Sequence, residues 1–128
     1  MPDQPDTDRA VEAALAEDLL SIHIDSYGKG AARATVHVIE DSVICFLDEL
    51  ELQRNEEFMI GAGHAHAVVE MRSRYEAAIE ATFQAAVERA TGRRVVSFVS
   101  ATKLSPNYAV EIFRLGPRKD LPLDEPSE

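Results

Sequence analysis

The tetrapeptide Tyr27–Gly28–Lys29–Gly30 is the local sequence with the clearest chemical potential. Glycines around a lysine let backbone N–H groups approach an anion such as phosphate. A phosphate loop, however, precedes a helix whose N-terminus faces the anion, whereas this tetrapeptide follows a predicted helix. Glycine in the left-handed conformation commonly ends a helix, and Lys29 suits the negative end of the helix. The order of elements therefore favours a helix cap over an anion site.

Arg72 and Arg74 would supply positive charge to the alternative hypothesis, an anion or small-molecule site built on residues 27–30. Guanidinium groups bind carboxylates and phosphates through paired hydrogen bonds. In a predicted helix Arg74 lies four residues after Glu70 and Arg72 lies four residues before Glu76, which favours ordinary ion pairing. Both interpretations stay open, and ion pairing is the simpler one.

A metal site has little support in the sequence. His64 and His66 are two residues apart, and side chains with this spacing point in different directions from a helix. His66 and Glu70 share a helical face, but zinc sites in proteins take three or four ligands. We predict no metal and no cofactor.

Nucleophilic chemistry also lacks a recognisable set of residues. Cys45 falls in a predicted inner strand, where cysteine usually acts as a small hydrophobe. Ser97 and Ser100 have no Gly-x-Ser-x-Gly context. His23 and His37 are expected on partly exposed polar faces. No catalytic residue is assigned, and a non-enzymatic protein is favoured.

Composition excludes several classes of protein. The 128 residues carry a formal charge of −10, which repels nucleic-acid backbones. No run of about eighteen apolar residues is present, so we expect no membrane insertion. The acidic N-terminus does not resemble a signal peptide, and the single cysteine allows no internal disulfide. These features predict a cytoplasmic protein.

The longest predicted element is a helix over residues 64–91 that ends at Gly92. At about 1.5 Å per residue it is roughly 40 Å long, enough to cross a small sheet. Apolar residues recur in it at three- and four-residue steps, which predicts one buried stripe. The predicted stripe comprises Val68, Met71, Tyr75, Ala78, Ile79, Thr82, Ala86 and Ala90, with Phe83 and Val87 beside it.

The remaining elements predict an α+β fold. A helix capped by Asp8 runs to about residue 26, strands cover 32–39 and 42–47, a short helix starts near Gln53, and strands follow at 93–101 and 108–115. The order α-β-β-α-α-β-β favours a two-layer sandwich with a four-stranded, mainly antiparallel sheet under the long helix. Residues 1–7 are expected to be a disordered leader, 8–117 a single domain and 118–128 a disordered acidic tail. One face of the sheet would lack a cover, from which we predict a homodimer.

Several local sequences together resemble the MpsC-like family over roughly residues 8–117. They are Tyr27–Gly28–Lys29–Gly30, a hairpin ending near Leu47, Glu57 in a short amphipathic segment, Arg72 or Arg74, Thr91–Gly92–Arg93 before Val95, and Glu111–Ile112–Phe113. The family usually has proline where this chain has Ala31, and a Leu-Thr pair is common where Glu51–Leu52 stands here.

The family is named for the Na+-translocating, membrane-potential-generating system of bacteria. The resemblance therefore implies an accessory role beside a membrane ion- or bicarbonate-handling complex, and it carries over no catalytic residue. We accordingly expect a soluble accessory or regulatory protein that binds other proteins, an integral membrane subunit among them. An anion or small-molecule sensor is the alternative.

Overall fold

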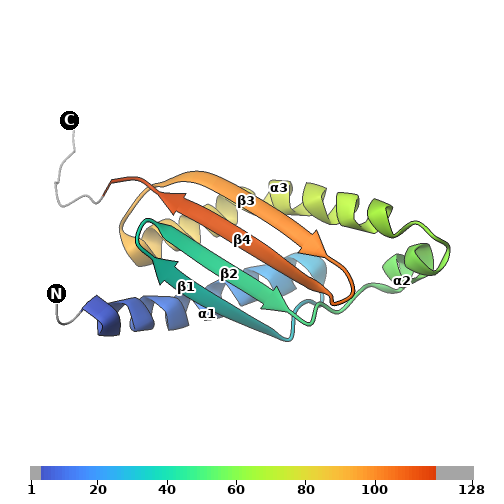
Figure 1. Cartoon of the computed structure of the whole chain (residues 1–128), viewed down its shortest axis with the longest axis horizontal. Helices are drawn as coiled ribbons and strands as arrows, with labels where there is room; N and C mark the ends of the chain where they lie inside the picture. Colours follow the sequence, from blue (N-terminus) through green and yellow to red (C-terminus); the bar gives the residue numbers. More distant parts are fainter. Residues whose placement is uncertain (1–3, 118–128) are drawn as a thin grey trace.

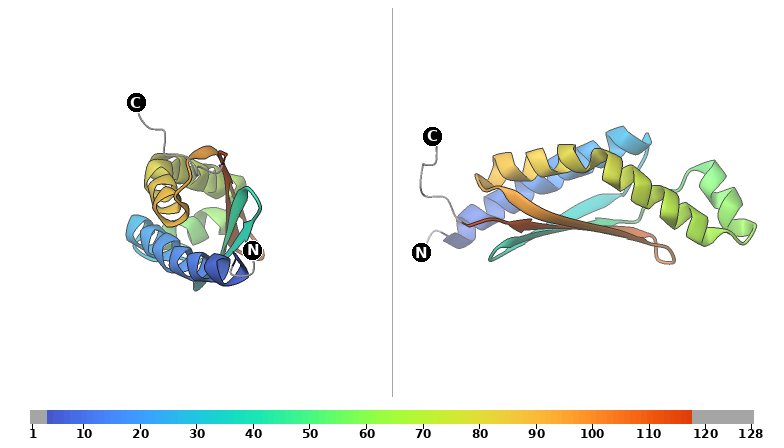
Figure 2. Two further views of the ribbon diagram at one scale, coloured as in Figure 1. Left: turned by 90° about the vertical axis from the view of Figure 1, so that its left-hand side faces the viewer. Right: turned by 90° about the horizontal axis from the view of Figure 1, so that it is seen from above.

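The computed structural model describes residues 4–117 as a sheet with helices on one face (Figure 1). The elements are α1 (Gln4–Tyr27), β1 (Arg33–Ile39), β2 (Ser42–Asp48), α2 (Arg54–Gly61), α3 (Ala65–Thr91), β3 (Val95–Lys103) and β4 (Tyr108–Leu115). The predicted α+β class, element order and long helix on the sheet are confirmed. Figure 2 shows α1 and α3 on the same face of the sheet, with α2 beyond the end of the strands.

All three strand pairings are antiparallel, and the spatial order is β1-β2-β4-β3. The chain therefore leaves the sheet after β2, passes through α2 and α3, and returns on the far edge as β3. The register aligns Cys45 of β2 with Glu111 of β4, and Glu111 with Ser100 of β3. Because cross-strand partners share a face, Glu111 lies on the helix-covered side between these two residues.

Glycines end the two long helices, α1 and α3. Gly28 has a φ of 80° and its N–H donates to the Ile24 carbonyl, and Gly92 has a φ of 71° and donates to Glu88. Both are the left-handed caps that the sequence predicts. The start of α1 differs from the prediction, since the helix begins at Gln4 rather than at Asp8. Residues 4–7 of the predicted leader are therefore helical, whereas residues 1–3 and the predicted tail 118–128 lie outside the described residues.

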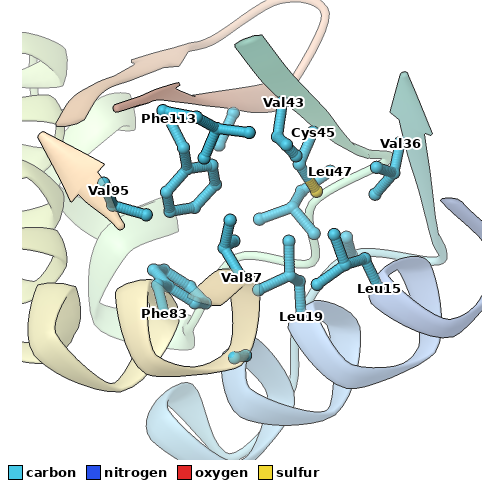
Figure 3. Close-up of a cluster of buried hydrophobic side chains, with 14 of the residues drawn as sticks. Leu15, Leu19, Val36, Val43, Cys45, Leu47, Phe83, Val87, Val95 and Phe113 are labelled. Carbon is cyan, nitrogen blue, oxygen red and sulfur yellow. The ribbon is translucent and has the colours of Figure 1, made fainter. Parts of the chain in front are cut away.

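The main core lies where α1 and the C-terminal half of α3 cover the sheet (Figure 3). Phe83 and Phe113 meet edge to face, with ring centroids 6.5 Å apart, and both are fully buried. Leu15, Leu19, Val43, Cys45, Leu47 and Val87 fill the space around them. Cys45 is thus a packed core residue, as its inner strand predicts.

The buried stripe of α3 differs from the prediction, most clearly in its N-terminal half. Val68, Phe83, Ala86 and Val87 are buried as expected, whereas Ala78 and Thr82 are exposed. In the N-terminal half Met71 and Tyr75 are 55% and 47% exposed. The buried positions there are the adjacent Arg72 and Glu76. The prediction ranked residues by apolarity and was wrong at these positions, because the polar pair is buried through partners on other elements.

The second face of the sheet, which we call the open face, is covered by no element among residues 4–117 (Figure 2). Its two central cross-strand rows are largely apolar. They comprise His37, Ile44, Ile112 and Val99 in one row and Thr35, Phe46, Val110 and Ala101 in the other. Rows with more polar residues flank them, namely Arg33, Asp48, Tyr108 and Lys103 at one end and Ile39, Ser42, Arg114 and Ser97 at the other.

Candidate functional site

A cluster of polar side chains is buried between the helices and the sheet, which we call the polar cluster. Its members come from five elements, each of which contributes only one or two residues. They are His23 and Tyr27 of α1, Glu56 of α2, Arg72 and Glu76 of α3, Ser100 of β3 and Glu111 of β4. Buried ionisable groups of this kind are costly unless they are paired, so their arrangement decides what the site can do.

Arg72 is the central cation of the polar cluster and is only 1% exposed. Its Nε and Nη2 atoms donate to the two carboxylate oxygens of Glu56, at 2.8 and 2.9 Å. Burial alone would raise the pKa of Glu56, but hydrogen bonds from Arg72 and from the Gln53 backbone outweigh it and hold this pKa below its usual value. The Arg72 guanidinium also lies 4.6 Å from the ring centroid of Tyr27, a cation–π arrangement.

Two buried carboxyl groups, those of Glu76 and Glu111, lie side by side. Glu76 Oε2 accepts a 2.8 Å hydrogen bond from the Tyr27 hydroxyl. Glu76 Oε1 and both oxygens of Glu111 accept no well-formed hydrogen bond from the described residues, and the polar groups beside Glu111 are Glu76 and the Ser100 hydroxyl. Two adjacent carboxylates in a dry site cannot both carry charge at low cost, so the pair retains a proton.

The pKa values of the pair and of Tyr27 follow from this environment. Burial, reinforced by the adjacent charge of Glu76, raises the pKa of Glu111 to about 9. Burial also raises the pKa of Glu76, although the Tyr27 hydroxyl and Arg72 act in the opposite direction. Burial and Glu76 raise the pKa of Tyr27, so the phenol stays protonated and acts as a donor.

His23 is fully buried, which corrects the prediction that it lies on a partly exposed polar face. Burial, with a smaller effect of Arg72, lowers its pKa to about 4, so the imidazole is neutral. A Cβ atom on Gly30 would lie 2.4 Å from His23 Cδ2. The Gly-Lys-Gly sequence therefore needs Gly28 for its left-handed backbone and Gly30 for room beside the imidazole. His37 is exposed, as predicted.

The predicted ligand-binding residues separate in space. Tyr27 and Arg72 belong to the polar cluster and Gly30 lies beside its His23, whereas Gly28 is an exposed cap. Lys29 Nζ lies 3.5 Å from both the Leu52 carbonyl and a Glu51 carboxylate oxygen. Arg74 is exposed, and Arg72 pairs with Glu56 rather than with Glu70 or Glu76.

Sequence reasoning missed His23, Glu56, Glu76 and Glu111 as members of one site. A signal for Glu111 was present, because it interrupts the apolar strand Ala-Val-Glu-Ile-Phe on the side that faces the helices. Glu76 also carried a signal, since it follows Arg72 by one helical turn. Neither signal indicates that the two carboxyl groups meet.

Two adjoining hollows of about 190 and 380 Å³ lie beside the polar cluster, between α2, α3 and the end of α1. Asn55, Glu56 and Met71 line both hollows. Met59, Ala67 and Val68 complete the smaller one, which makes its lining mainly apolar. Within residues 4–117 no three His, Cys, Asp or Glu side chains are grouped as metal ligands.

Comparison with known proteins identifies the family. The family described as Na+-translocating membrane potential-generating system (MpsC) matches residues 7–116, nearly the whole chain. This chain belongs to the MpsC family. The resemblance noted in the sequence is thereby confirmed, and MpsC membership suggests association with a membrane Na+-translocating system. No curated protein and no solved structure matches the MpsC chain described here. None of the helices of this MpsC chain between residues 4 and 117 has the length and apolarity needed to cross a bilayer.

Proposed function

We propose that this MpsC-family chain is a non-enzymatic accessory protein that acts by binding other proteins, and that its open face binds a second copy of the chain. The observation that supports the proposal is the composition of the open face. Its centre is apolar and its ends carry charge, as in the apolar core and polar rim of protein interfaces. Val99 is 54% exposed there, on the edge strand β3, where its cross-strand partner is the apolar Ile112.

The apolar residues of the open face are also typical of a sheet that packs against another sheet. Antiparallel strands whose two faces are both apolar usually lie between two layers, and sheets stack about 10 Å apart. Phe46 of β2 and Val110 of β4 are direct cross-strand partners at its centre and are only half-buried. A twofold axis would place the same residues of two copies against each other.

The polar cluster supports a role other than catalysis. Glu76 and Glu111 are 2% and 0% exposed, so a substrate has no direct access to the carboxyl pair. General acid–base catalysis needs a group within hydrogen-bond reach of the substrate. We therefore assign the protein a binding role, in which the dimer docks on an integral subunit of the Na+-translocating system at the cytoplasmic surface.

Light scattering coupled to size exclusion tests the dimer. We expect a dimer at micromolar concentration, and we expect Phe46→Glu to yield a folded monomer because a buried unpaired carboxylate opposes association. Phe58→Glu is the matched control, since Phe58 is 73% exposed on α2, away from the open face. A monomeric wild-type chain, or dimers from both variants, would overturn the proposed interface.

Cross-linking in native membranes tests the partner. We expect the wild-type chain to be cross-linked to an integral membrane subunit, and Phe58→Glu and Phe46→Glu to show which surface mediates the contact. Absence of any membrane subunit among the cross-linked products would contradict the docking role while leaving the dimer result intact.

An anion sensor at residues 27–30 with Arg72 and Arg74 is the second candidate. It draws less support, because Arg72 already donates to both oxygens of Glu56 and Lys29 lies beside Glu51. If it held, phosphate or bicarbonate would raise the melting temperature of the wild-type chain but not of Lys29→Ala. Equal effects on both proteins would exclude this candidate.

A further inference from the structure

Polar side-chain contacts join helix α2 and the residue before it to α3 and α1. None of its residues is buried, and Phe58 is 73% exposed. One attachment is the pair of hydrogen bonds from Arg72 to Glu56. Another is the Gln53 side-chain amide, which donates to the Tyr27 carbonyl at the start of the helix. Because no residue of α2 is buried, the Arg72–Glu56 pair is one of the contacts that hold this helix in place.

Two carboxylates, those of Glu56 and Glu76, are close enough to interact with Arg72. Glu56 binds it now, and Glu76 lies one turn further along the same buried side of α3. Tyr27 contacts both Arg72 and Glu76. The centroid of its ring lies 4.6 Å from the Arg72 guanidinium, and its hydroxyl oxygen lies 2.8 Å from Glu76 Oε2. The Arg72 charge already acts on Glu76.

The groups that face the Glu76–Glu111 pair come from every packed element. Tyr27 of α1 donates to Glu76, and the Ser100 hydroxyl of β3 lies beside Glu111. Cys45 of β2 is also close to the pair: after burial, the charges of Glu111, Asp48 and Glu76 help to raise its pKa. Among these neighbours the only cation is Arg72, and His23 beside it is neutral. A second negative charge on the pair could therefore be compensated only by movement of Arg72 or by opening of the site.

We propose that Glu76 and Glu111 form a proton-controlled latch for α2. While the pair holds one proton, Arg72 binds Glu56 and α2 stays docked. When that proton leaves, Arg72 turns to Glu76, Glu56 is released, and α2 separates from α3. Separation exposes apolar side chains that line the smaller hollow, Met59 of α2 and Ala67 and Val68 of α3.

In this latch the Arg72 side chain has two positions, on Glu56 or on Glu76, and the charge of the Glu76–Glu111 pair decides between them. Burial holds the pKa of Glu111 at about 9, so the docked state predominates near neutral pH and release follows on the alkaline side. Cys45, whose pKa burial raises to about 12, keeps its proton through this range. The latch does not depend on the open face, so it can be tested in a monomeric or a dimeric chain.

Hydrogen exchange of residues 54–61, corrected for the intrinsic effect of pH, measures release in the unaltered chain. We expect the protection of this segment to fall about tenfold between roughly pH 7 and pH 10, while that of β2 and β4 stays constant. Met59→Trp gives an independent readout, because Met59 lines the hollow between α2 and α3 and the chain contains no tryptophan of its own. Its emission should shift to longer wavelength over the same range as α2 separates.

Three variants separate the latch from general alkaline loosening. Glu111→Gln leaves the pair with at most one negative charge and should abolish the response. Glu56→Gln removes the docked partner of Arg72 and should release α2 already at neutral pH. Glu57→Gln removes a neighbouring exposed charge of α2 and should respond as the wild-type chain does.

The latch is overturned if Glu111→Gln responds to pH like the wild-type chain, or if the wild-type segment keeps its protection throughout. Glu76→Gln serves as the second variant should Glu111→Gln lose its circular-dichroism signature of the fold. A response that survives in both glutamine variants would assign the effect to a group outside the pair.

Discussion

The Tyr27 hydroxyl donates a 2.8 Å hydrogen bond to Glu76 Oε2 and thereby joins the end of α1 to the middle of α3. The same tyrosine ring packs under the Arg72 guanidinium, 4.6 Å from its centroid. One side chain thus satisfies a buried carboxylate with its hydroxyl and contacts a buried cation with its ring. This relationship explains why α3 can bury Arg72 and Glu76 where an apolar stripe was expected.

Tyr27→Phe should destabilise the protein by about 1–3 kcal/mol, because it leaves Glu76 Oε2 buried without a donor while the ring contacts stay. Urea denaturation near neutral pH measures this loss. Tyr75→Phe is the matched control, since Tyr75 is 47% exposed and should change stability by less than about 0.5 kcal/mol. Equal losses in the two variants would show that the Tyr27 hydrogen bond contributes nothing specific.

Glu111→Gln should stabilise the protein at neutral pH and flatten its pH dependence. The folded state raises the pKa of Glu111 from 4.5 to about 9, so between these values the folded chain binds a proton that the unfolded chain has released. Stability from this group is therefore complete below pH 4.5 and declines as pH rises through about 9. Near pH 7 the variant should gain roughly 1–3 kcal/mol.

Urea denaturation at a series of pH values provides the measurement. The wild-type and Glu111→Gln curves should converge near pH 4.5 and diverge steadily above it. Glu57→Gln, an exposed acid on α2, should parallel the wild-type chain. Parallel wild-type and Glu111→Gln curves would show that Glu111 titrates alike in the folded and unfolded states.

Gly30→Ala should destabilise the protein by about 1–3 kcal/mol, because its Cβ would lie 2.4 Å from His23 Cδ2. A second substitution, His23→Ala, should relieve this clash, so the two changes should be strongly non-additive in a double-mutant cycle. Gly61→Ala meets no atom within 4 Å and should be neutral or slightly stabilising. Additive effects at positions 23 and 30 would contradict the proposed contact.

Cys45 should resist thiol reagents in the folded protein. It is fully buried, and burial together with the charge of Glu111 raises its pKa to about 12, so almost no thiolate is present. We expect labelling at least about a thousandfold slower than in the denatured chain, limited by unfolding. Colorimetric titration with an aromatic disulfide reagent measures both rates, and rapid labelling of the native chain would contradict the packing of β2.

Local sequence patterns predicted most of the elements. Ala34, Val36 and Val38 alternate with Arg33, Thr35 and His37 in the predicted strand 32–39, and Val36 is buried on the side that faces the helices. Only two residues, Glu40 and Asp41, separate the predicted strands 32–39 and 42–47, and the structure pairs Ile39 with Ser42 in a hairpin. Gly28 and Gly92 predicted both helix ends. These features depend on neighbours within a few residues, so the chain itself encodes them.

Tertiary structure alone decided the polar cluster. Apolarity favoured Met71 and Tyr75 for the inner side of α3, but the helix is rotated so that the adjacent Arg72 and Glu76 face inward. That choice rests on Glu56 and Tyr27, which are 16 and 49 residues away along the chain. The meeting of Glu76 with Glu111 depends further on β4 lying in the middle of the sheet, beside β2. Sequence periodicity reports how often a side chain faces inward, whereas the cost of burying a charge depends on partners that only the folded chain brings together.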